Sequence, residues 1–149
     1  MKLNVPYIRQ TGPLDCWHAA IRMIYAYKKQ MSPNPAPSLY QADAGLSQDC
    51  ASVAAMAKDS GMKAVPIQPV NEQQLEATLR TYGPLWLPLN DVSGANGAHV
   101  VVITGVENGT IYINDPAWLT NPSQENKKAR NMLWFNRYFA RAAGLLYLP

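Results

Sequence analysis

The segment 10–20, QTGPLDCWHAA, constrains the fold and chemistry of this chain more than any other stretch. The residues after Cys16 are apolar at helical spacing: Trp17, Ala20, Ile21, Ile24 and Tyr27. Pro13 and Asp15 precede them as helix-start signals, so we expect a helix from Cys16 to about Gln30. A cysteine reacts as its thiolate, which the positive end of a helix stabilises. The segment therefore predicts Cys16 as a nucleophile at the start of a helix.

Gln10 and Cys16 are separated by five residues, a spacing that can complete a nucleophilic site. Attack of a thiolate on a carbonyl carbon produces an oxyanion, which needs hydrogen-bond donors that are already in place. The side-chain amide of Gln10 and the backbone N–H of Cys16 can supply two such donors. We therefore expect an acyl-transfer site with Cys16 as the nucleophile and Gln10 at the oxyanion.

The chain has two histidines that could serve as the base. His18 lies two residues beyond Cys16, about 200° round the helix, so the two side chains should diverge and we interpret His18 as structural. His99 opens the apolar run AHVVVITGV, directly after a loop that contains glycine. The alternative interpretation of His99 is a half-buried strand histidine, but the need of Cys16 for a base favours the catalytic one.

Two apolar runs on either side of Glu107–Gly109 form the clearest hairpin pattern in the sequence. A turn of two residues would place His99 and Asp115 on opposite faces of the sheet. A loop of three residues, with Gly109 left-handed, would place Val101 opposite Asp115 and make His99 and Asp115 diagonal neighbours on one face. We therefore predict the three-residue loop.

Asp115 is the candidate for the group that orients the imidazole of His99 by accepting a hydrogen bond from its other ring nitrogen. In the predicted register Asn114 points to the opposite face, which makes it the weaker candidate. The alternative interpretation of Asp115-Pro116 is a simple turn initiator.

The remaining pattern places helices first and antiparallel strands afterwards, which indicates an α+β fold class. Asn71 and Gly83 mark the ends of one helix, and Pro88 demotes its strand to an edge or irregular position. The further elements that we expect are a helix to Ser60 with Ser47 as its N-cap, a helix at 72–82, strands at 63–67, 84–89 and 144–148, and a helical or irregular segment at 132–142.

With 149 residues, 48% of them apolar and 15% charged, the chain is expected to form one domain, 1–149, with a helical half at about 1–83 and a sheet half at about 84–149. The net charge is only +3, and we interpret the basic cluster 127–130 as a solvated loop or helix start. No apolar run approaches the roughly 20 residues of a membrane span. We therefore expect no nucleic-acid or membrane partner.

The two cysteines do not make a disulfide framework, and we interpret Cys50 as a buried apolar residue of the second helix. Cys16, His18, Cys50 and His99 lack any standard zinc spacing. We therefore expect neither a metal nor a cofactor. No Sec-type signal is visible, so we expect synthesis in a reducing cytoplasm, with a signal-less route if the protein is exported.

Three segments carry a family resemblance: QTGPLDCWHAAIRMIYAY, LRTYGPLWLPLN and GAHVVVITGVENGTIYINDPA. Together they resemble compact bacterial papain-like cysteine proteases, especially the double-glycine leader peptidase domains of bacteriocin exporters and papain-like type III effector proteases. The resemblance extends from Val5 to Pro116. It implies a papain-like fold with Gln10 at the oxyanion, Cys16 as nucleophile, His99 as general base and acid, and Asp115 as orienter.

The resemblance also implies a function: a protease that acts on protein or peptide substrates, in the manner of secreted effectors or toxins held by a cognate immunity protein, and that cuts after Gly-Gly. We expect a monomer. The same triad could instead run an amidase, a deubiquitinase-like hydrolase or a transglutaminase-like acyl transfer. A catalytically inactive peptide-binding module is the alternative from a different class.

Overall fold

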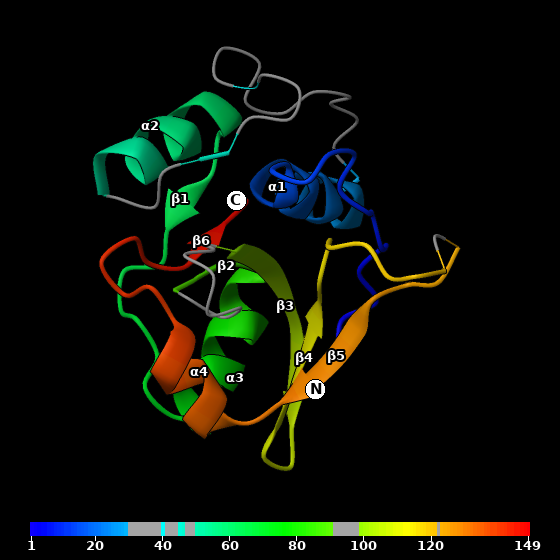
Figure 1. Cartoon of the computed structure of the whole chain (residues 1–149). Coiled ribbons are helices and arrows are strands. Elements are labelled where there is room, and N and C mark those ends of the chain that lie inside the picture. The colour runs from blue at the N-terminus through cyan, green and yellow to red at the C-terminus, as the bar shows by residue number, and fades with distance from the viewer. Residues whose placement is uncertain (30–39, 41–44, 47–49, 91–98, 122) are drawn as a thin grey trace.

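A central antiparallel sheet with helices on both faces organises the chain (Figure 1). The computed structural model describes residues 1–29, 40, 45–46, 50–90, 99–121 and 123–149. In chain order its elements are α1 (Cys16–Tyr27), α2 (Cys50–Ser60), β1 (Lys63–Ala64), α3 (Glu72–Tyr82), β2 (Leu85–Leu89), β3 (His99–Glu107), β4 (Thr110–Asn114), β5 (Lys127–Arg130), α4 (Met132–Tyr138) and β6 (Leu146–Tyr147). The strands lie in the order β1-β6-β2-β3-β4-β5. The predicted α+β class is confirmed.

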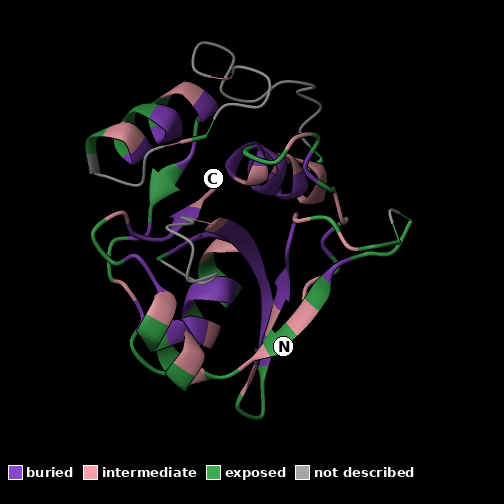
Figure 2. Cartoon of the chain, viewed as in Figure 1, coloured by how far each residue is buried: buried purple, intermediate pink, exposed green. Residues whose placement is uncertain are grey.

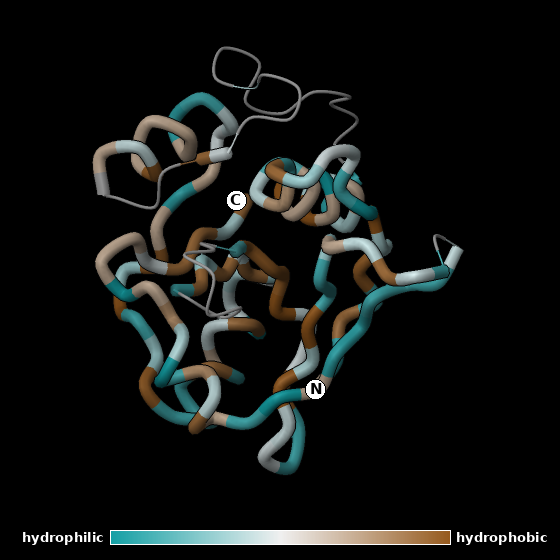
Figure 3. Tube along the Cα trace, viewed as in Figure 1, coloured by the Kyte–Doolittle hydropathy of each residue, from teal (hydrophilic) through white to brown (hydrophobic). Residues whose placement is uncertain are grey.

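Each face of the sheet has its own apolar core. On one face Trp86 and Val102 pack with residues of α1 and α2, and on the other Leu87 and Ile103 pack with residues of α3 and α4. Strands covered on both faces are apolar at nearly every position, which explains the sequences of β2 and β3. Figure 2 shows these two strands buried, and Figure 3 shows the contrast between their apolar course and the hydrophilic β5. Helix α3 thus packs on the face opposite α1.

The hairpin of β3 and β4 has a two-residue turn, so the predicted three-residue loop is wrong. Glu107 pairs with Thr110, and the turn residues Asn108 and Gly109 have φ of 50° and 80°, as hairpins with both central residues left-handed require. The register shifts between Ile103 and Gly105, because Thr104 is one extra residue in β3, a β-bulge. Below the bulge Val102 pairs with Asn114.

The bulge keeps Asp115 on the same face of the sheet as His99. A two-residue turn without a bulge would place the two residues on opposite faces. Continuing the register from Val102 and Asn114 by one residue places Val101 opposite Asp115, as the sequence predicted for a different reason. At the bulge the N-terminal segment approaches closely: Lys2 bridges to Gly105, where a Cβ would lie 2.6 Å from the carbonyl oxygen of Met1. Only glycine fits this contact.

The basic cluster 127–130 forms edge strand β5, which corrects its interpretation as a solvated loop or helix start. It pairs antiparallel with β4, with Lys128 opposite Ile113. Its residues alternate between exposed and half-buried, the period of a strand. Lysine and arginine on an edge strand also discourage pairing with other chains.

Strand β2 lies inside the sheet between β6 and β3, so the edge position predicted from Pro88 is wrong for the strand as a whole. The carbonyl of Pro88 accepts from the backbone N–H of Ala140 at 3.0 Å. In an antiparallel strand the N and C=O of one residue point to the same side, so the proline nitrogen also points away from β3. Strand β6 pairs with β2 at Trp86, two residues earlier. The proline therefore removes no β2–β3 hydrogen bond.

Two predicted helix starts are confirmed. Helix α1 begins at Cys16 and ends at Tyr27, slightly before the expected end. Helix α3 is capped by Asn71, whose side chain accepts the backbone N–H three residues on at 2.9 Å. The predicted Ser47 cap of the second helix lies outside the described residues.

The C-terminal predictions hold with shorter elements. The segment predicted as helical or irregular at 132–142 contains α4, and the predicted strands at 63–67 and 144–148 are the two-residue β1 and β6, which pair with each other. Across the described part of the chain, every helix is too short or too polar to cross a bilayer.

Candidate active site

Helix α1 presents Cys16 as its first residue. The helix is fixed to the sheet by fully buried Ile21 and Ile24 and by the indole of Trp86, which donates to the carbonyl of Trp17 at 3.1 Å. Cys16 is half-buried and lies at the positive end of the helix, where a thiolate is stabilised. A small pocket beside it is lined by Leu14, Trp17, Leu46 and His99, among others.

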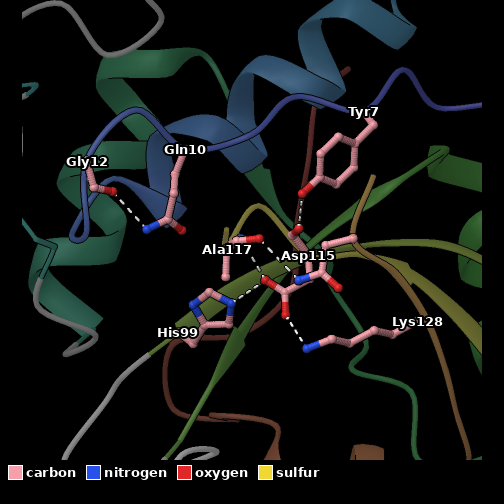
Figure 4. A network of polar contacts seen from close by, with 8 residues as sticks. Tyr7, Gln10, Gly12, His99, Asp115, Ala117 and Lys128 are labelled. Atoms are coloured by element: carbon pink, nitrogen blue, oxygen red, sulfur yellow. Dashed lines mark hydrogen bonds and ion pairs between the residues drawn. The ribbon is translucent and has the colours of Figure 1, made fainter. Parts of the chain in front are cut away.

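His99 is the first residue of β3 and joins the helix to the end of β4. Its Nε2 lies 2.6 Å from Oδ1 of Asp115, and His99 lines the same small pocket as Cys16. Because Nε2 faces the carboxylate, Nδ1 lies on the other side of the ring (Figure 4). The structure therefore brings Cys16, His99 and Asp115 together at one place, as the sequence predicted.

The surroundings of His99 favour its charged form. Burial alone lowers the pKa of the imidazole, but the hydrogen bonds and charges of Asp115 and Cys16 outweigh burial and raise the pKa to about 9. At neutral pH the ring is then an imidazolium with both nitrogens as donors.

Asp115 is 4% exposed, and both oxygens of its carboxylate accept hydrogen bonds. Its Oδ1 accepts from His99 and from the backbone N–H of Ala117 at 2.9 Å, and its Oδ2 accepts from Nζ of Lys128 at 2.9 Å (Figure 4). Burial raises the pKa of this carboxyl, but His99, Lys128 and the Ala117 N–H outweigh burial and lower it to about 2. Asp115 is therefore a fixed carboxylate, not a bare turn initiator.

Gln10 is buried in the loop before α1, and its backbone is tied to the chain beyond Asp115. Its N–H donates to the carbonyl of Pro116 at 2.9 Å, and its carbonyl accepts from the indole of Trp118 at 2.6 Å. Its side-chain Nε2 donates one hydrogen to the carbonyl of Gly12 at 2.8 Å, which leaves the second amide hydrogen for another acceptor.

Asp15 is the N-cap residue of α1, in agreement with its interpretation as a helix-start signal, but its side chain makes no capping hydrogen bond. It is 2% exposed, and its Oδ2 instead accepts from the hydroxyls of Thr11 at 2.5 Å and Tyr40 at 3.2 Å. The backbone of Asp15 does accept the N–H of Ala19. The carboxylate therefore braces the loop that leads to Cys16.

The remaining candidates take positions apart from this line. His18 is buried and stacks on Tyr40, with ring centroids 3.8 Å apart, in agreement with a structural role. The side-chain amide of Asn114 donates to the carbonyl of Val5 at 3.2 Å, so Asn114 is not the residue that orients His99. The side chain of Cys50 lies outside the described residues.

Sequence reasoning missed three residues around Asp115. Lys128 binds its carboxylate, Tyr7 donates to its backbone carbonyl at 2.6 Å, and Trp118 holds Gln10. The run 127–130, KKAR, has no apolar alternation that could have indicated the position of Lys128. The contacts of Tyr7 and Trp118 join residues more than a hundred positions apart and leave no local pattern.

The chain matches the family model described as the papain-like cysteine protease AvrRpt2 (peptidase family C70) over residues 1–139. No curated protein sequence matches it. Among solved structures it is similar to a double glycine motif protease from an AMS/PCAT transporter in complex with the leader peptide, with 25% identity, a TM-score of 0.58 and coverage of 99% of this chain and 91% of that one.

It is also similar in fold to a C39-like peptidase from Bacillus anthracis, with 17% identity, a TM-score of 0.54 and coverage of 100% and 98% of the two chains. The family match spans nearly the whole chain and contains every residue of the site described above. The chain thus belongs to the AvrRpt2 family of papain-like cysteine proteases.

Proposed function

We propose that this protease cleaves peptide bonds through a triad of Cys16, His99 and Asp115, with Gln10 at the oxyanion. The observation that carries the proposal is the position of His99, which lines one small pocket with Cys16 and whose Nε2 lies 2.6 Å from the buried carboxylate of Asp115. The raised pKa of His99, about 9, supports an imidazolium beside the nucleophile at neutral pH. That charge state is the one that a thiolate needs from its partner.

The reaction then runs in two halves. The Cys16 thiolate attacks the peptide carbonyl carbon, and the resulting oxyanion is bound by the Cys16 N–H and the second amide hydrogen of Gln10. As the C–N bond breaks, Nδ1 of His99 gives its proton to the leaving amine, and a thioester remains. Neutral His99 then takes a proton from water, whose oxygen attacks the thioester. The C–S bond breaks, which releases a carboxylic acid and regenerates the ion pair.

The proposed substrate is a protein or peptide cut after Gly-Gly. Two observations support this specificity. The similar transporter protease is a double glycine motif protease, and the pocket beside Cys16 is small and is lined by Leu14, Trp17 and Leu46. Residues without side chains before the scissile bond fit such a narrow site best.

The biological role that we propose is that of an effector or toxin, with a cognate immunity protein that covers the cleft. This part rests on the resemblance of the sequence to effector proteases. Co-expression of a neighbouring open reading frame that suppresses toxicity, and that binds the Cys16→Ala protein, would support it. Equal growth of cells with the wild type and with Cys16→Ala would contradict it.

The decisive experiment maps new protein N-termini across a proteome after expression of the wild type and of Cys16→Ala. We expect new termini preceded by Gly-Gly that are absent with the variant. Identical maps, with Cys16 still alkylated, would contradict proteolysis and favour an amidase or a transglutaminase-like transferase; a new amide in place of a free carboxylate would identify the transferase. Failure of Cys16 to react at all would favour a peptide-binding module.

A further inference from the structure

Lys128 stands out among the cations of this protein because its ammonium binds the buried carboxylate behind the candidate base. Its Nζ lies 2.9 Å from Oδ2 of Asp115, on the oxygen that His99 does not use. The Asp115 side chain is 6% exposed, whereas that of Lys128 is 35% exposed. A cation at this distance, on a carboxylate removed from water, is a strong charge-assisted contact.

The two oxygens of Asp115 have different partners from different strands. Oδ1 accepts from His99 on β3 and from Ala117, and Oδ2 accepts from Lys128 on β5. With both oxygens held, the carboxylate plane cannot rotate, so Oδ1 stays aimed at the imidazole (Figure 4). Loss of the ammonium would leave Oδ2 buried without its donor, which is costly for a charged acceptor.

We propose that Lys128 is a positioning residue for catalysis: it fixes the plane and the charge of Asp115, and through Asp115 the orientation of His99. This inference rests on the proposed triad and extends it to a fourth member from the edge strand. Lys128 does not reach substrate, because Asp115 and His99 lie between it and Cys16.

The charges around Asp115 determine the expected pH effect. Besides Lys128, the titratable groups that face it include His99 on β3, with Cys16 of α1 behind that ring, and Tyr7 on the N-terminal segment. Removal of the ammonium takes a positive charge away from the surroundings of the His99 imidazolium, which favours its charged form. The basic limb of the profile, set by loss of the proton from His99, should then move to higher pH.

The rate of alkylation of Cys16 by iodoacetate against pH tests this without knowledge of the substrate. For Lys128→Met we expect a rate at pH 7 lowered about tenfold and the basic limb raised by about half a pH unit or more. Lys128→Arg should keep the basic limb in place. Lys127→Met is the matched control, because Lys127 is an exposed neighbour that pairs with Glu125, and it should behave as the wild type.

A surface cavity of about 380 Å³ gives a second readout, because Lys128 lines it together with Lys2, Tyr112 and Asn114. In Lys128→Ala, ethylammonium ions can enter where the lysine side chain was. We expect added ethylammonium to restore part of the alkylation rate, whereas ethanol, similar in size but neutral, should not. Wild type with ethylammonium controls for direct effects of the amine.

Several outcomes would overturn the inference. A basic limb that stays in place in Lys128→Met, with a lower amplitude only, would indicate a merely structural role, and so would equal rescue by ethanol. Additive losses in Asp115→Asn/Lys128→Met would show that Lys128 does not act through Asp115. A separate measurement tests the proposed triad. An alkylation rate of Cys16 that is the same in His99→Ala as in the wild type would contradict the triad itself.

Discussion

The two sides of the candidate site differ in how completely their polar groups are satisfied. On the base side, the carboxylate of Asp115 has three donors and its backbone carbonyl a fourth. On the nucleophile side, within the described part of the chain, Oε1 of Gln10 and Oδ1 of Asp15 are buried without a hydrogen-bond partner. Such groups are costly and concentrate at functional sites.

This difference indicates a division of labour. The base side is complete before substrate arrives, so it holds the imidazolium in place at no further cost in ordering. The loop 10–15 before Cys16 retains polar atoms that a peptide backbone or water can satisfy. We therefore expect changes on the base side to reduce activity and stability together, and changes in the loop to reduce activity alone.

The largest effect should follow deletion of Thr104, the bulge residue. With a two-residue turn and no bulge, Asp115 would move to the face opposite His99, and activity should fall below detection. A compensating insertion of one residue between Asn108 and Gly109 restores the parity of the hairpin and should restore part of the activity. The measurement is Cys16 alkylation alongside circular dichroism. A deletion variant with normal reactivity would contradict this reading of the register.

Asp115→Asn should have the next largest effect. The amide can present a donor to Nε2 and so hold the wrong tautomer of His99, which in related triads costs up to about 10⁴ in kcat. It also leaves Lys128 without its counter-charge, so the urea midpoint should fall as well. Steady-state kinetics and urea unfolding measure the two effects. A variant with a low kcat but an unchanged urea midpoint would show that the contacts of Asp115 do not stabilise the fold.

The pH dependence of the free energy of unfolding should report the interaction between His99 and its partners. The pKa of His99 is 6.5 when unfolded and about 9 when folded. Its stabilisation is therefore complete below pH 6.5 and is lost as the pH rises through 9, by about 3 kcal/mol in total. Urea unfolding between pH 6 and pH 10 measures it. His99→Ala is the control and should flatten this slope; an equal slope in the variant would assign the effect to other groups.

The smallest effect is expected on the nucleophile side. Gln10→Ala removes the proposed oxyanion donor and should lower kcat about 100-fold with little change in KM. It also removes a buried oxygen that lacks a partner, so stability should hardly change. Kinetics with a substrate found by terminus mapping, together with the urea midpoint, tests both. A large loss of stability would remove the distinction between the two sides.

The sequence predicted the residues that have a local pattern. Cys16 was found from the helix that follows it, His99 from its apolar strand, and Asp115 from the even spacing of sixteen residues after His99. For His99 and Asp115 to share one face at this spacing, the hairpin needs one residue more than a regular two-residue turn provides. The spacing does not give the position of that residue. We placed it in the turn, whereas the protein places it at Thr104, where the N-terminal segment packs against the strand.

The parts that could not be predicted depend on contacts between distant segments. Lys128 lies in a run whose charge suggested solvent, and its partner is thirteen residues away on a neighbouring strand. Asp15 has the residue type and position of an N-cap, yet hydroxyls of Thr11 and Tyr40 compete for its carboxylate. Propensity gave the local preference in both cases, and tertiary contacts decided the outcome.

The N-terminal segment runs beside the hairpin and is fastened to it in sequence. Leu3 donates to Thr104, Val5 accepts from Asn114, Tyr7 donates to Asp115 and Gln10 donates to Pro116. Under a pulling force applied to the chain before Leu3, these hydrogen bonds would break one after another rather than bear the force together. Gln10, the proposed oxyanion residue, would be released last of the four, while helix α1 still holds Cys16 against the sheet.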